Sequence, residues 1–517
     1  MQIDYKNIVI DVKEGTPVSE LLGDEIQKAK CKVIACKFNN EIKSLNFKIK
    51  ASGKLDLIDL NNKDGMRIYR RGLVYIISKA ISEVYPGALM TIKYQLSNAM
   101  YCTVDNLKIT NEVISNINKR VKEIIKQDLP IEKRFMTKDE AEEFYKKENT
   151  LKGKLQLDLK QKKEVTLYYC EDYYNYFYGV LPISTDFAEA YEITKYSDGF
   201  LIRYPSKDNP YELSEFQDTP KLFATLEEYQ KLHRILNVNT LYKLNSIVKK
   251  GDIQEYVLLD EALHEKKIGA IADCIASNRK IKLIAIAGPS SSGKTTFAKR
   301  LGLQLRLNGL KPVIISVDNY FVEREQTPVD EEGKFDFESI HAIDTKLLNS
   351  DLVKLLAGEE IKAPTFNFHT GHKEYKGNKM KLAPDEVLVM EGIHCLNDEL
   401  TYLIPKDQKF KIYISCLTVL NIDYYNRIST TDTRLIRRIV RDNNFRGYSA
   451  THTLEMWPSV NRGEVNNIFK FQEEADCMFN SSLIYELSVL KKYAVPLLKE
   501  IDATSPLYSE AKRLIAM

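Results

Sequence analysis

The chain has 517 residues, which is too many for one ordinary hydrophobic core, so we expect two to four domains. Its 75 lysines and arginines nearly balance 72 aspartates and glutamates, and the net charge of +3 gives no argument for nucleic-acid binding. The eight cysteines include no C-x-x-C pair, which favours buried, reduced thiols in a cytoplasmic protein. We find no signal-peptide layout and no apolar run that could span a bilayer, so we expect no membrane partner.

Residues 1–62 are predicted to form a small α/β unit. Residues 6–12 have the pattern of a strand. Residues 32–38, the turn at Asn39-Asn40 and the residues that follow predict a β-hairpin. This order of elements resembles the TGS domain, a ubiquitin-like β-grasp module.

Residues 63–215 are predicted to form a second domain of the α+β class. A helix that begins near Tyr69 and an aromatic segment over 168–179 together resemble the second additional domain of threonyl-tRNA synthetase. The editing site of that family uses histidine and cysteine ligands. The matching positions here hold Arg71, Tyr75, Phe177 and Leu181. None of these side chains is a zinc ligand of that type, so the resemblance implies a shared fold without editing activity.

Two interpretations of the aromatic segment stay open. Its tyrosines can pack their rings in a core and leave their hydroxyls wet. They can also stack on the bases of RNA. The residues that come next, 216–264, mix charges of both signs and are expected to form a helical connector.

The most specific motif opens the last region, residues 265–517. Residues 288–295 fit G-x-x-x-x-G-K-[ST], the phosphate-binding P-loop. An apolar run over 281–287 precedes the motif, and an amphipathic helix over 295–308 follows it. This order directs backbone N–H groups and a helix N-terminus at the phosphates of a nucleoside triphosphate. The candidate nucleotide-binding residues are Gly288, Ser290, Ser291, Ser292, Gly293, Lys294, Thr295 and Thr296.

Two carboxylates follow predicted strands of this region. Strand and helix patterns alternate there, which predicts a parallel sheet with helices on both faces and ligands at the carboxyl ends of the strands. Asp318 follows the run 313–317 and is a candidate base for an acceptor hydroxyl, with a turn or N-cap aspartate as the alternative. Glu391 follows the run 387–390 and is, with Thr295, a candidate Mg²⁺ ligand. A solvent-facing strand end is the alternative for Glu391.

An arginine-rich helix is predicted beyond residue 430, with Thr431 and Asp432 as candidate N-caps. Four arginines follow i, i+3, i+4, i+7 spacing and therefore share one face. They are Arg434, Arg437, Arg438 and Arg441, and Arg446 extends the cluster. Guanidinium groups suit the charge that spreads over a transferring phosphoryl group, so we expect a lid that closes over the phosphates. A surface helix paired with nearby acids is the alternative.

Six segments, in this order, resemble the uridine kinase and phosphoribulokinase family. They are 288–296, 317–321, 335–338, 364–368, 389–393 and 432–446. The resemblance implies that Lys294 holds the triphosphate and that Asp318 activates the acceptor. It implies that Arg437, Arg441 and Arg446 are lid arginines. It also implies that Glu338, Phe366 and His372 lie at the acceptor site.

The acceptor side departs from the family pattern. Glu338 stands where uridine kinases carry an aspartate, and Phe366 stands where they carry a tyrosine. A longer acid and a lost hydroxyl both change hydrogen bonding to an acceptor, and hydrogen bonds discriminate strongly between substrates. The phosphotransfer machinery is therefore better supported than uridine itself.

The sequence predicts a kinase that uses ATP and Mg²⁺ to phosphorylate the 5′-hydroxyl of a ribonucleoside, with uridine or cytidine the leading candidate. A kinase for another small alcohol, as phosphoribulokinase is, and an RNA-associated nucleotide switch are the alternatives. Asp318 favours transfer, because a switch needs only to position water. The sequence leaves open homo-oligomer formation, the preferred phosphate donor, feedback regulation and the role of the N-terminal modules.

Overall fold

The computed structural model describes residues 1–148, 157, 164–329, 333, 335–367 and 370–517. Its first sheet has five strands in the order β2-β1-β5-β3-β4, with β1 and β5 parallel. The elements are β1 Gln2–Tyr5, β2 Ile8–Asp11, α1 Val18–Leu21, α2 Gly23–Gln27, β3 Val33–Phe38, β4 Glu41–Lys43 and β5 Gly53–Asp59. The predicted β3–β4 hairpin is confirmed, because Asn39 and Asn40 both take the positive φ that a tight hairpin turn requires.

The strand expected over residues 6–12 is only partly right. Lys6 and Asn7 have φ of 51° and 64° and form a turn, so β2 begins at Ile8 and pairs back onto β1. Lys6 and Asn7 are polar, so their turn leaves no hydrophobic signal in the sequence. The short strand β1 before them was missed for that reason.

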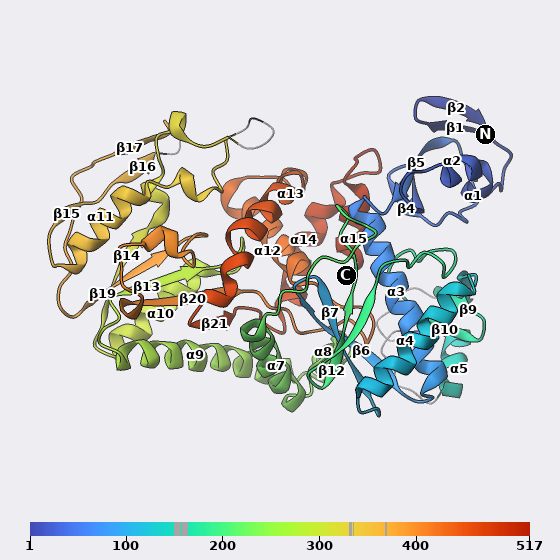
Figure 1. The fold of residues 1–517 in the computed structure, drawn as a ribbon, viewed down its shortest axis with the longest axis horizontal. Helices are drawn as coiled ribbons and strands as arrows, with labels where there is room; N and C mark the ends of the chain where they lie inside the picture. The colour runs from blue at the N-terminus through green and yellow to red at the C-terminus, as the bar shows by residue number, and fades with distance from the viewer. Residues whose placement is uncertain (149–156, 158–163, 330–332, 334, 368–369) are drawn as a thin grey trace.

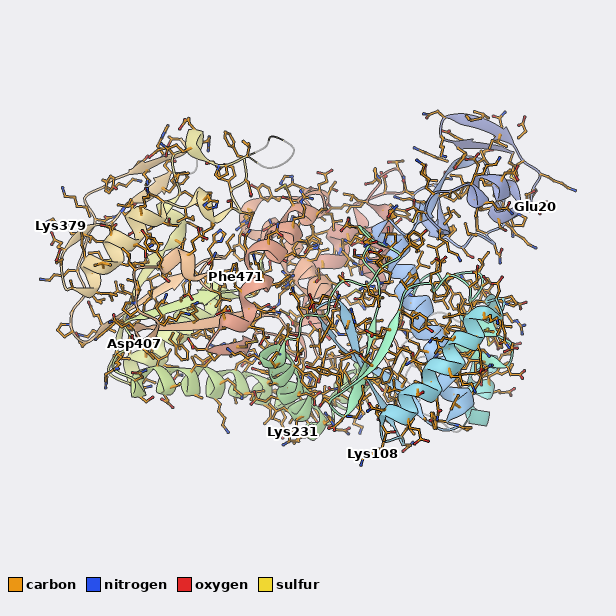
Figure 2. All side chains as sticks on the ribbon, viewed as in Figure 1. Glu20, Lys108, Lys231, Lys379, Asp407 and Phe471 are labelled. Carbon is orange, nitrogen blue, oxygen red and sulfur yellow. The ribbon has the colours of Figure 1, made fainter. Side chains whose placement is uncertain are left out.

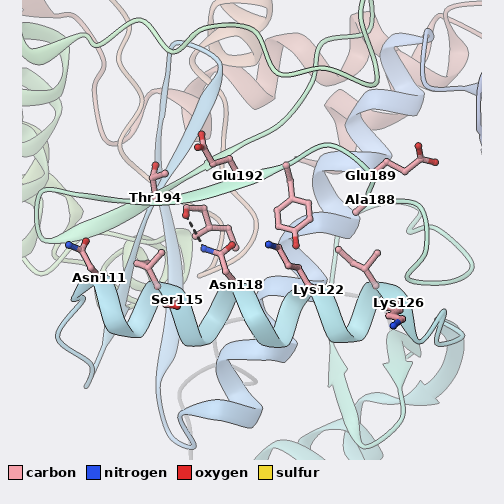
Figure 3. Close-up of a pocket in the computed structure, with 13 residues that line it drawn as sticks. Asn111, Ser115, Asn118, Lys122, Lys126, Ala188, Glu189, Glu192 and Thr194 are labelled. Carbon is pink, nitrogen blue, oxygen red and sulfur yellow. Dashed lines mark hydrogen bonds between the residues drawn. The ribbon is translucent and has the colours of Figure 1, made fainter.

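The second region surrounds a long helix, α3, with two antiparallel sheets of orders β10-β9-β8 and β11-β12-β7-β6. The elements are α3 Lys63–Val84, β6 Leu89–Leu96, β7 Ala99–Asp105, α4 Asn111–Lys126, β8 Glu132–Thr137, α5 Lys138–Glu148, β9 Glu164–Cys170, β10 Tyr173–Asn175, β11 Glu192–Tyr196 and β12 Gly199–Arg203. Figure 3 shows an open groove between α4 and β11, where the side-chain amide of Asn118 donates to the carbonyl of Ile193 at 3.1 Å.

The aromatic segment packs as a core. Tyr168 and Phe177 are buried, and the ring of Tyr75 on α3 meets Tyr173 and Phe177 edge-on at centroid distances of 5.2 and 5.8 Å. These contacts confirm the core interpretation for the rings that they involve, because the rings pack on one another.

Three helices lead into the C-terminal region: α7 Pro220–Ile235, α8 Leu241–Lys250 and α9 Ile253–Ser277. The helix α9 runs across residue 264, where we expected the connector to end. Its last turns carry Ile268, Ala272 and Ile275, which pack against the C-terminal sheet. One continuous helix therefore belongs both to the connector and to the last domain.

The C-terminal region contains a five-stranded, wholly parallel sheet in the order β14-β19-β13-β20-β21. The strands and helices of this layer are β13 Leu283–Ala287, α10 Lys294–Leu307, β14 Lys311–Ser316, α11 Thr345–Leu356, β19 Glu386–Glu391, β20 Lys409–Ser415, α12 Thr430–Arg446, α13 Ala450–Asn467, β21 Cys477–Asn480, α14 Glu486–Lys499 and α15 Tyr508–Ala516. Short strands lie between α11 and β19: β15 Ile361–Lys362, β16 Thr365–Asn367, β17 His372–Glu374 and β18 Lys379–Met380.

Helices cover both faces of this sheet, as the sequence predicts. Along β13, Leu283, Ala285 and Ala287 face the core that contains α11. Ile284 and Ile286 face the opposite core, which contains α9 and α10. Side chains alternate between the faces of a strand, so a strand covered on both sides is apolar throughout.

Figure 1 shows the C-terminal sheet at one end of the molecule and the N-terminal modules at the other, with α12, α14 and α15 between them. Charged residues such as Lys108, Lys379 and Asp407 lie at the periphery in Figure 2. Among the described residues, no helix has the length and apolar character needed to cross a membrane. Six of the eight cysteines are buried, as expected.

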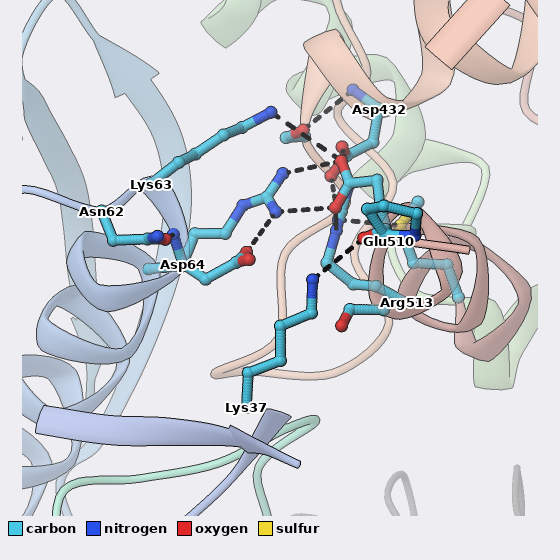
Figure 4. Close-up of polar contacts among 12 residues, drawn as sticks. Lys37, Asn62, Lys63, Asp64, Asp432, Glu510 and Arg513 are labelled. Atoms are coloured by element: carbon cyan, nitrogen blue, oxygen red, sulfur yellow. Dashed lines mark hydrogen bonds and ion pairs between the residues drawn. The ribbon is translucent and has the colours of Figure 1, made fainter. Parts of the chain in front are cut away.

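The end of the chain returns to its beginning. Arg67 of α3 donates to Glu510 of α15 at 2.7 Å, and Glu510 also accepts from Arg513, which in turn pairs with Asp432 of α12 (Figure 4). Lys37 of β3 donates to the carbonyl of Pro506. The N-terminal modules and the C-terminal helices are thus connected by charged contacts.

A carboxylate at the edge of the C-terminal sheet gives a stability prediction. Asp398 accepts from Lys409 at 3.0 Å and from Lys411 at 2.8 Å, and the two lysine side chains are only 4% and 9% exposed. Burial opposes ionisation of Asp398, but the hydrogen bonds from Lys411 and Lys409 prevail and lower its pKa to about 2. We expect Asp398→Asn to destabilise the protein by about 2 kcal/mol, less than a fully buried pair would lose because the carboxylate is partly exposed.

Thermal unfolding of the variant and the parent from pH 8 down to pH 2 measures this effect. The depressed pKa means that the stabilisation is present at neutral pH and is lost as the pH falls toward about 2, so the two melting curves should converge there. Asp385→Asn is the control, because Asp385 pairs with an exposed lysine, Lys311. Equal melting temperatures of both variants at pH 7 would contradict the assignment.

Candidate nucleotide-binding and phosphotransfer site

The P-loop connects β13 to α10, in the strand–loop–helix order that the sequence predicts. Gly293 has φ +88°, a conformation that glycine adopts at little cost, and Ser291 has φ 60°. A Cβ at Gly288 would lie 2.0 Å from the carbonyl oxygen of Ile414 on the neighbouring strand β20, so only glycine fits there. The loop is therefore fixed by backbone packing on the sheet.

Lys294 lies at the N-terminal end of α10. Its ammonium donates to the carbonyl of Gly288 at 2.7 Å. Burial lowers the pKa of Lys294, and the carboxylates of Glu391, Glu464 and Asp318 act in the opposite direction. The ammonium is thus held beside the loop with three carboxylates in its electrostatic environment.

The two predicted metal ligands meet. The hydroxyl of Thr295 donates to Glu391 Oε1 at 3.0 Å. Strand pairing explains this, because Glu391 ends β19 in register with Ile286 of β13, just before the P-loop. Within the described part of the chain, no cluster of three or more His, Cys, Asp or Glu side chains forms a metal site. One hydroxyl and one carboxylate fit Mg²⁺, which prefers oxygen and keeps positions for phosphate and water.

Asp318 follows the next strand, β14. It lies in a turn of 3₁₀ helix, Val317–Tyr320, and Ser316 just before it pairs in register with Glu391. The side chain is exposed, yet the surrounding protein raises its pKa by desolvation, with Lys294 opposing. A base is most effective when its pKa approaches the working pH, so this direction suits proton abstraction.

The arginine helix packs directly on the P-loop. Arg434 is 1% exposed and donates to both carboxylate oxygens of Glu464 on α13, at 2.5 and 2.9 Å. Glu464 also accepts from the backbone N–H of Ser290 at 2.8 Å, and Arg434 donates to the carbonyl of Ser290. The pair ties α12 and α13 to the phosphate-binding loop.

A second pair anchors the next arginine. Arg437 donates to Glu486 at 2.5 Å and to the carbonyl of Ser481 at 2.7 Å, and it reaches the carbonyl of Ser291 at 3.3 Å. Arg438 donates to the hydroxyl of Ser290 at 2.7 Å. The helix therefore lies where a lid would act, but its first arginines are already paired with acids.

The expected N-caps of this helix were wrong. The cap is Ser429, whose hydroxyl accepts from the N–H of Asp432. Asp432 lies inside the first turn and pairs with Arg513 of α15. Either serine or aspartate is a good cap, so the sequence alone placed the start of the helix two residues late.

The last arginines converge on one buried acid. Arg441 lies 2.7 Å from Asp442 and Arg446 lies 3.5 Å from it, while Asp442 is 1% exposed. Arg441 and Arg446 are 33% and 50% exposed, so they are the most accessible guanidinium groups of the predicted lid set. Sequence reasoning missed Glu464 and Glu486, because acids distant in sequence leave no pattern beside the arginines. It also missed Asp442, whose i,i+4 spacing to Arg438 and Arg446 was a signal that could have found it.

Two of the predicted acceptor residues, Phe366 and His372, contact the segment that follows Asp318. The N–H of Phe366 donates to the side chain of Asn319, and the Phe366 ring packs on Phe321 at 5.5 Å. His372 lies on the neighbouring strand β17, where its Nδ1 is 2.7 Å from Glu323. Phe368, within the same segment, lies outside the described residues.

Glu338, the third predicted acceptor residue, packs against α13. A Cβ at Gly463 of α13 would lie 3.1 Å from its carboxylate, and Asn467 donates to its carbonyl at 2.7 Å. Burial raises the pKa of Glu338, Glu464 adds to this, and Arg438 opposes it. The carboxyl group is thus held near the P-loop side of the site.

The region that carries this site is similar in sequence to known proteins. The sequence model of the Phosphoribulokinase / Uridine kinase family matches residues 283–484. The chain is 31% identical over 215 residues to a uridine kinase of Mycoplasma pneumoniae, covering 41% of this chain and 90% of that protein. It is 30% identical over 188 residues to one of Ligilactobacillus salivarius, covering 36% and 78%. A match of 30% identity to a uridine kinase of Schizosaccharomyces pombe covers 38% of this chain and 39% of that protein.

A solved structure described as a possible uridine kinase from Bacillus stearothermophilus shares 20% identity, covers 39% of this chain and 89% of that one, and has a TM-score of 0.22. A likeness at that score carries no argument. The sequence matches do support an assignment. They show that the chain belongs to the phosphoribulokinase and uridine kinase family. It is a P-loop kinase of the uridine kinase type, with the matched region in its C-terminal part.

The Arg434–Glu464 pair gives a test of how the P-loop is held. Glu464→Gln leaves Arg434 buried without its anion and weakens the acceptor of the Ser290 N–H, so we expect a loss of about 3–5 kcal/mol in stability. Thermal and denaturant unfolding measure it. Glu455→Gln, on the exposed face of α13, is the control. If Glu464→Gln and Glu455→Gln have the same melting temperature and the same denaturant midpoint, the Arg434–Glu464 pair does not support the loop.

Proposed function

We propose that the chain transfers the γ-phosphoryl group of ATP to the 5′-hydroxyl of a ribonucleoside, with uridine or cytidine as the leading acceptor. The observation that carries the proposal is the convergence of Lys294, Asp318 and the Thr295–Glu391 pair at the carboxyl ends of three adjacent strands. A nucleotide switch needs Lys294 and the Thr295–Glu391 pair, but it does not need a base with a raised pKa such as Asp318.

Each of these residues has a role in the transfer. Lys294 exchanges its contact with the Gly288 carbonyl for the β- and γ-phosphates. Thr295 and Glu391 hold Mg²⁺, which when bound neutralises phosphate charge. Asp318 takes the proton of the acceptor hydroxyl while the hydroxyl oxygen bonds to the γ-phosphorus. The bond between the γ-phosphorus and the oxygen that bridges it to the β-phosphate breaks, which releases ADP.

The arginines supply positive charge to this site. Arg441 and Arg446 are the accessible lid groups, and Arg437 holds the helix in place through Glu486 while it contacts the loop. Guanidinium groups stabilise the charge that develops on the equatorial oxygens during transfer. A helix already docked on the P-loop needs little movement to reach them.

Glu338, Phe366 and His372 are the proposed acceptor contacts. Glu338 offers a carboxylate to a ribose hydroxyl, and Phe366 offers a ring face to a base. His372 is engaged with Glu323 and so presents an imidazole with a fixed orientation. Because two of these residues differ from the uridine kinase pattern, a kinase for another small alcohol remains the second candidate function.

The N-terminal modules extend the proposal beyond the kinase region. We interpret residues 1–62 as a TGS-like β-grasp domain and 63–215 as a domain like the second additional domain of threonyl-tRNA synthetase, with 216–264 as connector and 265–517 as the kinase. The sheet order β2-β1-β5-β3-β4, with parallel central strands, supports the first assignment. A cytoplasmic role in pyrimidine salvage is consistent with this function, and RNA binding by these modules is the third candidate.

A nucleoside panel tests the proposed activity. With Mg²⁺ and ATP, we expect ADP formation to depend on uridine or cytidine and kcat to fall by about 10²–10⁴-fold in Asp318→Asn, since a general base contributes that much. Asp385→Asn, at the opposite end of the sheet, is the control. ADP formation that ignores every nucleoside, or that rises only with RNA, would contradict the proposal.

The same carboxylate sets the pH dependence. Asp318 must be deprotonated to act, and its pKa is raised, so activity should fall as the pH drops through a value above the ordinary aspartate pKa of about 3.9. The acid limb of kcat/KM against pH measures this value. An acid limb at or below pH 3.9 would exclude Asp318 as a desolvated base.

A further inference from the structure

A large cavity lies where the N-terminal modules meet the C-terminal helices. Its volume is about 910 Å³, within the range of small-molecule sites. The helix α3, the strands β6 and β7, the residues before α12 and the helix α15 all contribute to its wall. No residue of the P-loop, 288–296, lines it, so it is separate from the site of phosphotransfer.

The wall of this cavity is strongly basic. Lysines and arginines outnumber aspartates and glutamates ten to three among the residues that line it. Some of these charges are neutralised. Arg67 pairs with Asp64 and Glu510, and Arg513 pairs with Glu510 and Asp432, as Figure 4 shows.

Three lining arginines have no carboxylate partner among the residues that the structure describes. Arg70 donates to the hydroxyl of Tyr204 at 3.2 Å, Arg71 to the carbonyl of Val180 at 2.6 Å, and Arg427 to the carbonyl of Lys93 at 3.1 Å. Each side chain is only partly exposed. All of these acceptors are neutral, so three cationic groups share one recess without an anion bound directly to them.

These cations also repel each other. Burial, with a smaller contribution from the charge of Arg70, lowers the pKa of Arg71 and of Arg427 to about 10. Asp432 favours the charge on Arg427, but its oxygens are held by Arg513. Partly buried like charges are costly to keep unless an anion joins them, and guanidinium groups match phosphate oxygens in geometry.

Part of the lining is apolar and aromatic. Phe177 and Tyr425 line it with ring centroids 5.8 Å apart, and Ile92, Met100 and Leu417 lie in the same lining. Inorganic phosphate would leave this surface unused. A ligand that carries both a phosphate and a flat ring would use the basic and the apolar residues of the lining, and a nucleoside phosphate has that chemistry.

The cavity also touches the helix that contacts the P-loop. Ser429, which caps α12, and Arg434 both line it, and Arg434 donates to the carbonyl of Ser290. A ligand in the cavity would therefore rest on the beginning of the helix whose later arginines are the proposed lid.

We propose that this cavity is a second, non-catalytic site that binds a nucleoside phosphate. Its phosphate lies among Arg70, Arg71 and Arg427, and its base lies against the apolar part of the lining. The site would give the N-terminal modules a direct role, because α3 supplies two of the three arginines and the residues before α12 supply the third.

Binding stoichiometry tests this proposal. The full-length chain carrying Lys294→Ala, which removes the P-loop lysine, is titrated calorimetrically with ADP, with UMP and with inorganic pyrophosphate. We expect ADP or UMP to bind one site per chain. Arg70→Gln or Arg427→Gln in the same background should weaken that binding about tenfold or more, as expected for loss of a charged hydrogen bond.

Two variants make the result specific. Arg134→Gln removes an exposed arginine of the same module and should leave binding unchanged. Arg427→Lys keeps the charge and should weaken binding less than Arg427→Gln, which separates a lost charge from a fold defect when the melting temperatures agree. Absence of nucleotide binding, or binding indifferent to Arg70 and Arg427, would overturn the proposal. Binding of pyrophosphate alone would overturn the assignment of the ligand as a nucleoside phosphate.

Discussion

The buried ion pair between Arg434 and Glu464 is the interaction on which the site depends. Both groups are almost fully removed from water, and each satisfies part of the P-loop: Glu464 takes the N–H of Ser290, and Arg434 donates to its carbonyl. Desolvating two charges is expensive, so such a pair persists only when its geometry and extra hydrogen bonds are good. Here those conditions also fix the loop, so the pair positions the phosphate-binding residues as well as itself.

This constraint changes the way the arginine helix should act. A lid that swings freely would need unpaired guanidinium groups over its whole length. Instead, Arg437 is held by Glu486, and only Arg441 and Arg446 keep substantial exposure. The first half of α12 is therefore anchored on the P-loop, and its second half carries the accessible arginines. Its start also borders the basic cavity, and α15 binds it through Arg513 and Asp432.

The sequence predicted the parallel sheet and the P-loop because both have local signals: apolar runs covered on both faces, and a glycine pattern between a strand and a helix. It also brought Thr295 and Glu391 together correctly, since strands adjacent in a parallel sheet end at the same edge. Glu464 and Glu486 could not be predicted, because their importance comes from tertiary contacts with arginines that are distant in the sequence. Asp442 could have been predicted from its i,i+4 spacing to Arg438 and Arg446 in the same helix.

The N-terminal region shows the same limit. The hairpin at Asn39 and Asn40 was predictable from its turn chemistry, whereas β1 was lost because a turn of two residues interrupts an otherwise continuous strand pattern. Arg71 and Phe177 were noticed only as replacements for metal ligands. Their shared cavity with Arg427, which lies at least 250 residues later in the chain, emerges only from the folded arrangement.

The destination of the phosphoryl group distinguishes a nucleoside kinase from an enzyme that only hydrolyses ATP. Incubation of the full-length protein with Mg²⁺, uridine and ATP labelled at the γ-phosphate, followed by separation of the products, measures this directly. The account predicts that the label leaves ATP and appears on the 5′-oxygen of the nucleoside, in amounts equal to the ADP formed. Label found only in inorganic phosphate, at a rate independent of the nucleoside, would contradict it.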